Sequence, residues 1–185
     1  MAAWLQECPN CLFVARDLSV ASPEEHDVVK EIGFIEAGLS ENVPDLAIRF
    51  MRRAYIDAQT GQPRNAVFRL LQAAWVLDDR HLDANAPRSQ ASGMIREMGN
   101  QADLSLKLLQ LDLLRRIAAF DEMNAEADKL PVRLLDENQR KVLVAQRRAA
   151  IEGRRGAISF REALYPRDPS EPSEPIPPEW RDIFR

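Results

Sequence analysis

The sequence predicts an all-α protein built from a short, irregular array of helical hairpins. In residues 46–79, apolar side chains recur at helical spacing on both sides of a Thr-Gly-Gln-Pro break at positions 60–63. Glycine tolerates the left-handed end of a helix and proline fits the first turn of the next, so the break predicts two antiparallel arms. A weaker copy of this pattern covers residues 104–131, and another helix is expected near 87–98.

One short helix is expected ahead of this hairpin. The sequence Ser-Pro-Glu-Glu at 22–25 combines an N-cap serine, a proline at the first helical position and a glutamate at the third, which is a capping box. Gly38 offers an end to this helix. Its expected apolar face consists of Val28, Val29, Ile32 and Ile35.

The first arm of the hairpin is expected to keep its charged side chains away from its apolar face. Arg49, Arg52, Arg53 and Asp57 fall largely outside the helical stripe of apolar residues.

Two further elements follow the second hairpin. They are a long helix over residues 136–153, which ends at Gly153, and a short turn over residues 158–164.

The small and turn positions of the hairpin resemble those of a tetratricopeptide repeat. They are Ala54, Tyr55, Gly61, Ala66 and Ala73. Aligning Ala66 with Met123 separates the two copies by 57 residues, whereas a regular array repeats about every 34. The resemblance implies a degenerate tetratricopeptide-like array, in which the second turn lacks the expected glycine.

The composition changes at residue 165, where six prolines interleave with Asp, Ser and Glu up to residue 178. Such a segment predicts an extended tail rather than a packed core. Trp180, Ile183 and Phe184 then stand at i, i+3 and i+4, the spacing of an anchor for a hydrophobic groove. The chain therefore divides into an N-terminal segment (1–21), a helical domain (22–164) and a tail (165–185).

Composition narrows the classes of partner. The net charge is −4 with a pI near 5.3, so nucleic acid is not an expected partner. Apolar runs are too short for a membrane span and the N-terminus has no basic flank with an apolar core, so a cytoplasmic location is expected. Common catalytic motifs and paired carboxylates in an apolar setting are missing, and an enzyme is not expected.

Cys8 and Cys11 have the spacing of a metal-binding or redox pair. Tetrahedral zinc needs four ligands, so the pair requires either His26 and His81 or the same two cysteines of a second copy in a homodimer. Thiol-redox chemistry is another interpretation, although no thioredoxin-like sheet is expected. The third is a remnant knuckle whose cysteines pack as small apolar residues.

In the order of its parts, the chain is similar to a bacterial family of uncharacterised proteins. The matching features are the Cys-Pro-Asn-Cys sequence at 8–11, the tetratricopeptide-like helices, the Leu-Leu-Arg-Arg sequence at 113–116 and a final helix. Members carry two Cys-Pro-x-Cys pairs in a zinc-ribbon-like element. This chain keeps one pair and has Leu12 where the knuckle usually has glycine, so the resemblance implies architecture rather than activity.

Arginine pairs are the last candidate site. Arg52, Arg53, Arg115 and Arg116 would line a basic groove if the helices stacked in register. Alternatively, each pair flanks an apolar face and meets a nearby Asp or Glu. The sequence thus predicts a protein-interaction scaffold that binds a protein partner or its own tail in a helical groove. The alternative is a zinc-binding or thiol-redox protein that uses Cys8 and Cys11.

Overall fold

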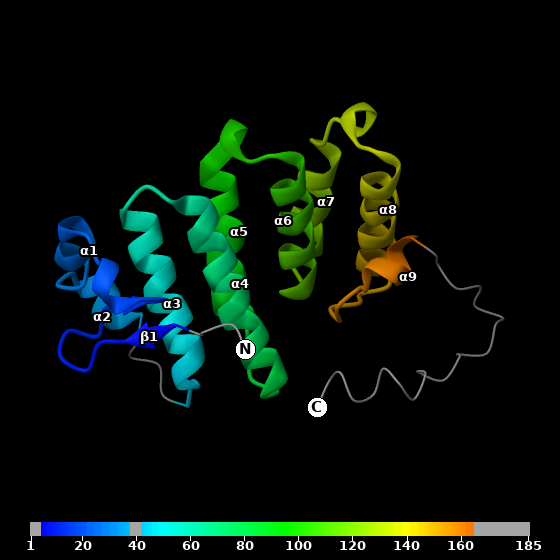
Figure 1. The fold of residues 1–185 in the computed structure, drawn as a ribbon. Coiled ribbons are helices and arrows are strands. Elements are labelled where there is room, and N and C mark those ends of the chain that lie inside the picture. Colours follow the sequence, from blue (N-terminus) through cyan, green and yellow to red (C-terminus); the bar gives the residue numbers. More distant parts are fainter. Residues whose placement is uncertain (1–4, 38–41, 165–185) are drawn as a thin grey trace.

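The computed structural model describes residues 5–37 and 42–164, and these residues are mainly helical. The helices follow one another in sequence order along one axis, from α1 to α9 (Figure 1). Each long helix packs against its neighbours in the chain, which gives a series of helical hairpins. The predicted all-α hairpin array is confirmed, whereas the predicted tail lies outside the described residues.

The N-terminal unit combines a small β-hairpin with two short helices. Strands β1 (Gln6–Glu7) and β2 (Val14–Ala15) pair antiparallel. A 3-10 turn, η1 (Leu18–Val20), leads to α1 (Pro23–Val28). The predicted capping box is confirmed, because the Glu25 N–H donates to Ser22 Oγ and the Ser22 N–H donates to a Glu25 carboxylate oxygen.

The single helix expected here is wrong, because the chain turns after Val28 and starts a second helix, α2 (Ile32–Glu36). The N–H groups of Lys30 and Glu31 bond to carbonyls only three residues back, which tightens and ends the first helix. The expected apolar face is therefore broken. Ile32 and Ile35 are exposed, whereas Val28 and Phe34 are buried.

Gly33 allows α2 to approach the first long helix closely. A Cβ atom at this position would lie 2.6 Å from the ring of Tyr55. The Tyr55 hydroxyl donates a hydrogen bond of 2.8 Å to Glu31 beside it.

The central hairpin consists of α3 (Asp45–Gln59) and α4 (Pro63–Asp79), with Gly61 at φ 73° in the turn. The break at 60–63 thus acts as predicted. The later elements also match the expected segments. They are α5 (Asn85–Met98), η2 (Gly99–Gln101), α6 (Leu104–Arg116), α7 (Phe120–Asp128), η3 (Val132–Leu134), α8 (Glu137–Ile151) and α9 (Phe160–Leu164).

The turn between α6 and α7 shows how the second hairpin forms without glycine. Ala118 adopts φ 64°, close to the value of Gly61. The hydrogen bonds match as well, since the Ala119 N–H donates to Leu114 O in the same way as the Gln62 N–H donates to Asp57 O. The left-handed conformation costs an alanine about 1–2 kcal/mol, so the packing of the two helices must offset this strain.

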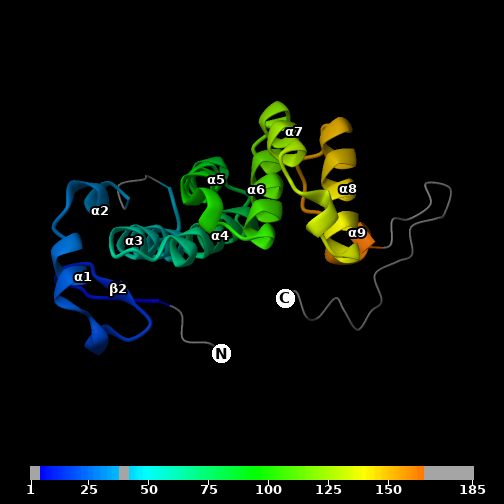
Figure 2. The ribbon, with the colours of Figure 1, turned by 90° about the horizontal axis from the view of Figure 1, so that it is seen from above.

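The hydrophobic core runs along the array as overlapping clusters rather than around one centre. One cluster joins α3, α4, α5 and α6, and a second joins α6, α7 and α8. Two further clusters seat the N-terminal unit on α3 and α4. Figure 2, which views the molecule of Figure 1 from above, shows the N-terminal unit and α8 at opposite ends of the helical array.

Candidate functional site

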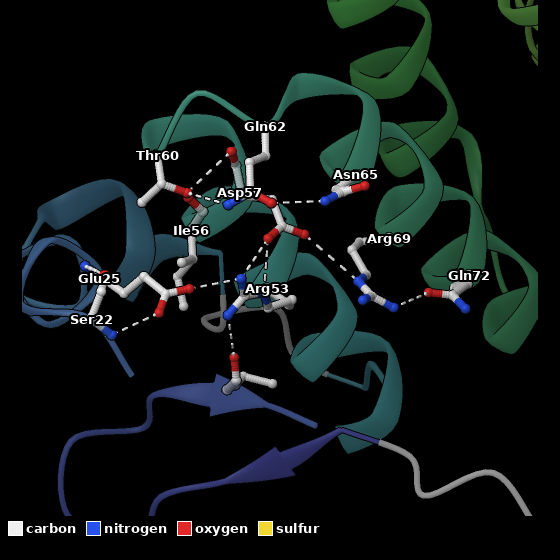
Figure 3. A network of polar contacts seen from close by, with 11 residues as sticks. Ser22, Glu25, Arg53, Ile56, Asp57, Thr60, Gln62, Asn65, Arg69 and Gln72 are labelled. Atoms are coloured by element: carbon white, nitrogen blue, oxygen red, sulfur yellow. Dashed lines mark hydrogen bonds and ion pairs between the residues drawn. The ribbon is translucent and has the colours of Figure 1, made fainter. Parts of the chain in front are cut away.

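A charged network fixes the N-terminal unit on α3 (Figure 3). Arg53 Nη2 lies 2.8 Å from a carboxylate oxygen of Glu25 on α1 and 2.7 Å from Asp57 Oδ1 on its own helix. Arg53 also donates to the carbonyl of Val14 on β2 at 3.3 Å. One guanidinium therefore connects α1, β2 and α3.

Asp57 is the buried centre of this network, with 2% of its surface exposed. Burial raises the pKa of its carboxyl, and the hydrogen bond and positive charge of Arg53 act in the opposite direction, followed by the charge of Arg69. Arg69 on α4 approaches Asp57 Oδ2 at 3.7 Å. These contacts link α1, β2, α3 and α4, which makes the network a structural joint.

Arg52 lies on the same covered side of α3. It is 9% exposed, donates to Glu7 at 2.8 Å and holds its guanidinium 5.6 Å from the ring centroid of Phe34. The sequence placed Arg52 and Asp57 away from the packing face, and for these two residues that is wrong. The N-terminal unit covers this side of α3, and a helical pattern read on α3 alone contains no sign of that cover.

Cys8 and Cys11 lie at the turn of the β-hairpin, as free, half-buried thiols. The Leu12 N–H donates to Cys8 O and the Cys8 N–H donates to Phe13 O, both at 2.9 Å, which closes a tight knuckle. Leu12 takes φ 62° at the position where a glycine would avoid strain. The pKa of Cys8 is lowered by the backbone N–H of Cys11, then by that of Asn10 and by the Cys11 side chain.

The ligand set for zinc is incomplete within the described part of one chain. Those residues contain no group of three or more His, Cys, Asp or Glu side chains that could hold a metal ion. His26 stacks its ring on Phe13 with centroids 5.6 Å apart, and His81 follows α4 at φ 57°. Both thiols instead pack on the cluster around Phe13. Two thiolates do not make a tetrahedral zinc site, so a fit would require ligands from a second chain.

The four arginines of the candidate basic groove are not brought together. Arg52 and Arg53 lie on α3, while Arg115 and Arg116 end α6. Arg115 is fully buried and pairs with Asp112, and Arg116 pairs with Asp78 at 2.8 Å. Each pair meets carboxylates of its own chain, which is the second arrangement that the sequence allowed.

Among the residues that the structure describes, the exposed large aromatic side chains lie on α4. Phe68 is 42% and Trp75 is 50% exposed, and their seven-residue spacing places them on one face of the helix. Arg64, which pairs with Asp103 at 2.6 Å, holds its guanidinium 5.8 Å from the Phe68 ring. We name this surface, formed by Arg64, Phe68 and Trp75, the α4 face.

Sequence reasoning missed the α4 face, although a signal was present. The buried residues of α4 include Ala66, Leu70, Ala73 and Leu77, which share one side of the helix. Phe68 and Trp75 fall on the opposite side by the same 3.6-residue period. The predicted anchor residues Trp180, Ile183 and Phe184 lie outside the described residues.

Within the described ranges, no helix has the length and apolar character needed to span a membrane. In comparisons with known proteins, the chain matches no family model, no curated protein and no solved structure.

Proposed function

We propose that this protein is an interaction scaffold that binds a protein partner through the α4 face. The observation that supports the proposal is the exposure of Phe68 and Trp75 on one side of a helix whose opposite side is packed. Trp75 is the one tryptophan among the described residues, and the core does not use it. Tryptophan and arginine are enriched among the residues that dominate binding energies.

The α4 face offers a useful amount of binding energy. A buried aromatic side chain contributes about 150–250 Å², and roughly half of each is still exposed here. Covering both leaves about 200 Å² of newly buried surface, or about 5 kcal/mol before the costs of association. A complementary partner therefore presents an apolar segment to Phe68 and Trp75. A carboxylate of that segment would pair with Arg64, which is half-exposed at its present ion pair.

The test begins with capture of binding proteins by the full chain, followed by purification of the captured protein and calorimetry of the reconstituted pair. Trp75→Ala is expected to weaken binding at least 30-fold, since truncating a central aromatic anchor costs about 2 kcal/mol or more. Leu134→Ala is the matched control, because Leu134 is 66% exposed on η3. Equal affinities for wild type and Trp75→Ala would refute the role of the α4 face.

The geometry of Cys8 and Cys11 favours a second candidate, a zinc-binding or thiol-redox protein. Two backbone N–H groups aim at the sulfur of Cys8, which stabilises a thiolate and suits it to metal binding or to nucleophilic attack. Zinc would then be shared by the knuckles of two chains, each giving two thiolates.

Metal analysis of the purified protein, combined with sedimentation, tests the zinc form of this second candidate. The zinc form predicts one zinc per two chains and a dimer, both lost in Cys8→Ser. A metal-free monomer that stays equally stable in Cys8→Ser contradicts it. Asn10→Ala is the control, because it keeps both thiols and its backbone N–H.

A further inference from the structure

The outer side of α8 is an unpartnered face at the end of the array. The helix packs against α6, α7 and α9 through a buried side that includes Leu143, Gln146 and Ala150. On the opposite side, Val144 is 65% exposed and Ile151 is 85% exposed. The seven-residue spacing of these two side chains aligns them along the helix.

Two arginines flank this apolar pair. Arg140 and Arg148 are exposed, and a helical period of 3.6 residues places them with Val144 and Ile151 in a sector about 80° wide. Neither arginine forms an ion pair with another residue of the described ranges, unlike Arg147, which pairs with Asp128. We name this surface, formed by Arg140, Val144, Arg148 and Ile151, the α8 face.

The carboxylate that shares the sector is already neutralised. Glu137, in the first turn of α8, lies 2.9 Å from the amine of Lys141. Glu137 faces the charges of both Lys141 and Arg140, so the α8 face presents apolar surface with a net positive charge from Arg140 and Arg148. A matching occupant carries large apolar side chains beside carboxylates.

We propose that the C-terminal segment of the same chain, residues 168–184, covers the α8 face. Trp180, Ile183 and Phe184 lie on Val144 and Ile151, and the acidic stretch before them runs beside the two arginines. This inference goes beyond the proposed function, because α8 and α4 are different helices with different occupants.

The sequence of the segment has the required chemistry. Between residues 168 and 180 it contains four carboxylates and no lysine or arginine. Three large apolar residues follow at the spacing of a single helical turn. Charge and hydrophobicity thus match the α8 face at both of its features.

The tether is long enough and starts at the right place. The described chain reaches Leu164 in α9, which packs on α8. Fifteen residues separate this point from Trp180, and at about 3.1 Å per residue they span about 45 Å. The axis of α8, with 15 residues, is only about 22 Å long. A tether of this length holds the anchor near α8 at a millimolar effective concentration, so even a weak contact is populated.

Photocrosslinking in the full chain tests this inference. Benzoylphenylalanine is placed at position 144 instead of Val144, the monomeric protein is irradiated, and the crosslinked peptides are mapped by mass spectrometry. We expect intrachain crosslinks to residues 179–185. The matched control carries the probe at Val20, which is 68% exposed in the N-terminal unit at the other end of the array. That control should give at least tenfold fewer crosslinks to the tail.

Charge reversal distinguishes docking from random collision of the tail. Arg140→Glu with Arg148→Glu should lower the intrachain yield at least fivefold, and adding Glu174→Arg with Glu179→Arg should restore most of it. Crosslinks only between chains would identify a second copy as the occupant. That result, equal yields from both probe positions, or no change on charge reversal would each overturn the inference. The Trp75→Ala binding assay is independent, so either proposal can fail alone.

Discussion

Replacing Arg115 tests whether the arginine pairs serve the fold or a binding groove. Its side chain is fully buried at the end of α6. Its Nε–H donates to Gln146 Oε1 at 2.6 Å, and its two terminal nitrogens donate to Arg154 O at 2.6 Å and to Asp112 Oδ1 at 2.7 Å. One guanidinium therefore ties α6 to α8 and to the segment that follows α8.

The expected cost of Arg115→Ala follows from these contacts. Each hydrogen bond from a charged donor contributes about 1.5–3 kcal/mol, but the sum for three bonds would overestimate the loss of folding stability in Arg115→Ala. Water recovers part of the loss, because the Asp112 side chain is 23% exposed. Removing one partner of a buried pair costs about 3–5 kcal/mol, and we expect this range. It is a large part of the roughly 5–15 kcal/mol that stabilises a typical domain.

Urea unfolding followed by circular dichroism measures this cost. With a slope of about 2 kcal/mol per M, the midpoint should fall by about 2 M. Arg115→Lys keeps the charge but loses the planar fork, so an intermediate loss is expected. Arg133→Ala, at an exposed residue of η3, is the control and should change stability by less than about 0.5 kcal/mol. A loss below 1 kcal/mol for Arg115→Ala, roughly the net worth of one hydrogen bond, would refute this reasoning.

Three further predictions each compare a substitution with a control for which the structure predicts the opposite change in stability, or compare wild type with a variant across pH. Ala118→Gly should stabilise the protein by about 0.5–1 kcal/mol in urea unfolding because it relieves the left-handed strain, whereas Ala125→Gly inside α7 should cost about 1 kcal/mol. Gly33→Ala should destabilise the protein by about 1–3 kcal/mol, because the new Cβ would meet the ring of Tyr55. Gly93→Ala in α5, where a Cβ meets open space, should stabilise it by up to about 1 kcal/mol. Stability changes of the same sign for the two variants would contradict the structure. Burial raises the folded-state pKa of Asp57 above its ordinary 3.8, so wild type should lose stability relative to Asp57→Asn as the pH rises from about 4 toward neutral. Urea midpoints measured over this pH range test the sign. A wild-type midpoint that rises relative to that of Asp57→Asn would exclude a raised pKa.

Local signals predicted most of the helices. The Thr-Gly-Gln-Pro break separates α3 from α4, and Asp136 caps α8 with a reciprocal hydrogen bond to Gln139. The hydrogen bonds of these turns and caps span at most five residues along the chain, so their geometry is encoded where they occur. The same local reasoning failed between residues 28 and 32, because three residues that belong to neither helix, 29–31, separate α1 from α2.

Candidate sites were less predictable, since exposure depends on what covers each side chain. Arg52 and Arg115 looked like surface residues in the sequence but are buried beneath the N-terminal unit and α8. Phe68 and Trp75 belong to an apolar helix, yet nothing in the described residues covers them fully.

The sequence by itself determined the all-α class, the hairpin turns and the helix caps, because these follow from short-range hydrogen bonds and backbone preferences. Only the tertiary structure decided which arginines are buried and connect neighbouring elements, and which aromatic side chains are exposed on the α4 face. The reason is that each helix has several sides. The periodicity of the sequence distinguishes the sides of a helix from one another. Elements from distant parts of the chain pack on some of these sides and determine which of them lose contact with water.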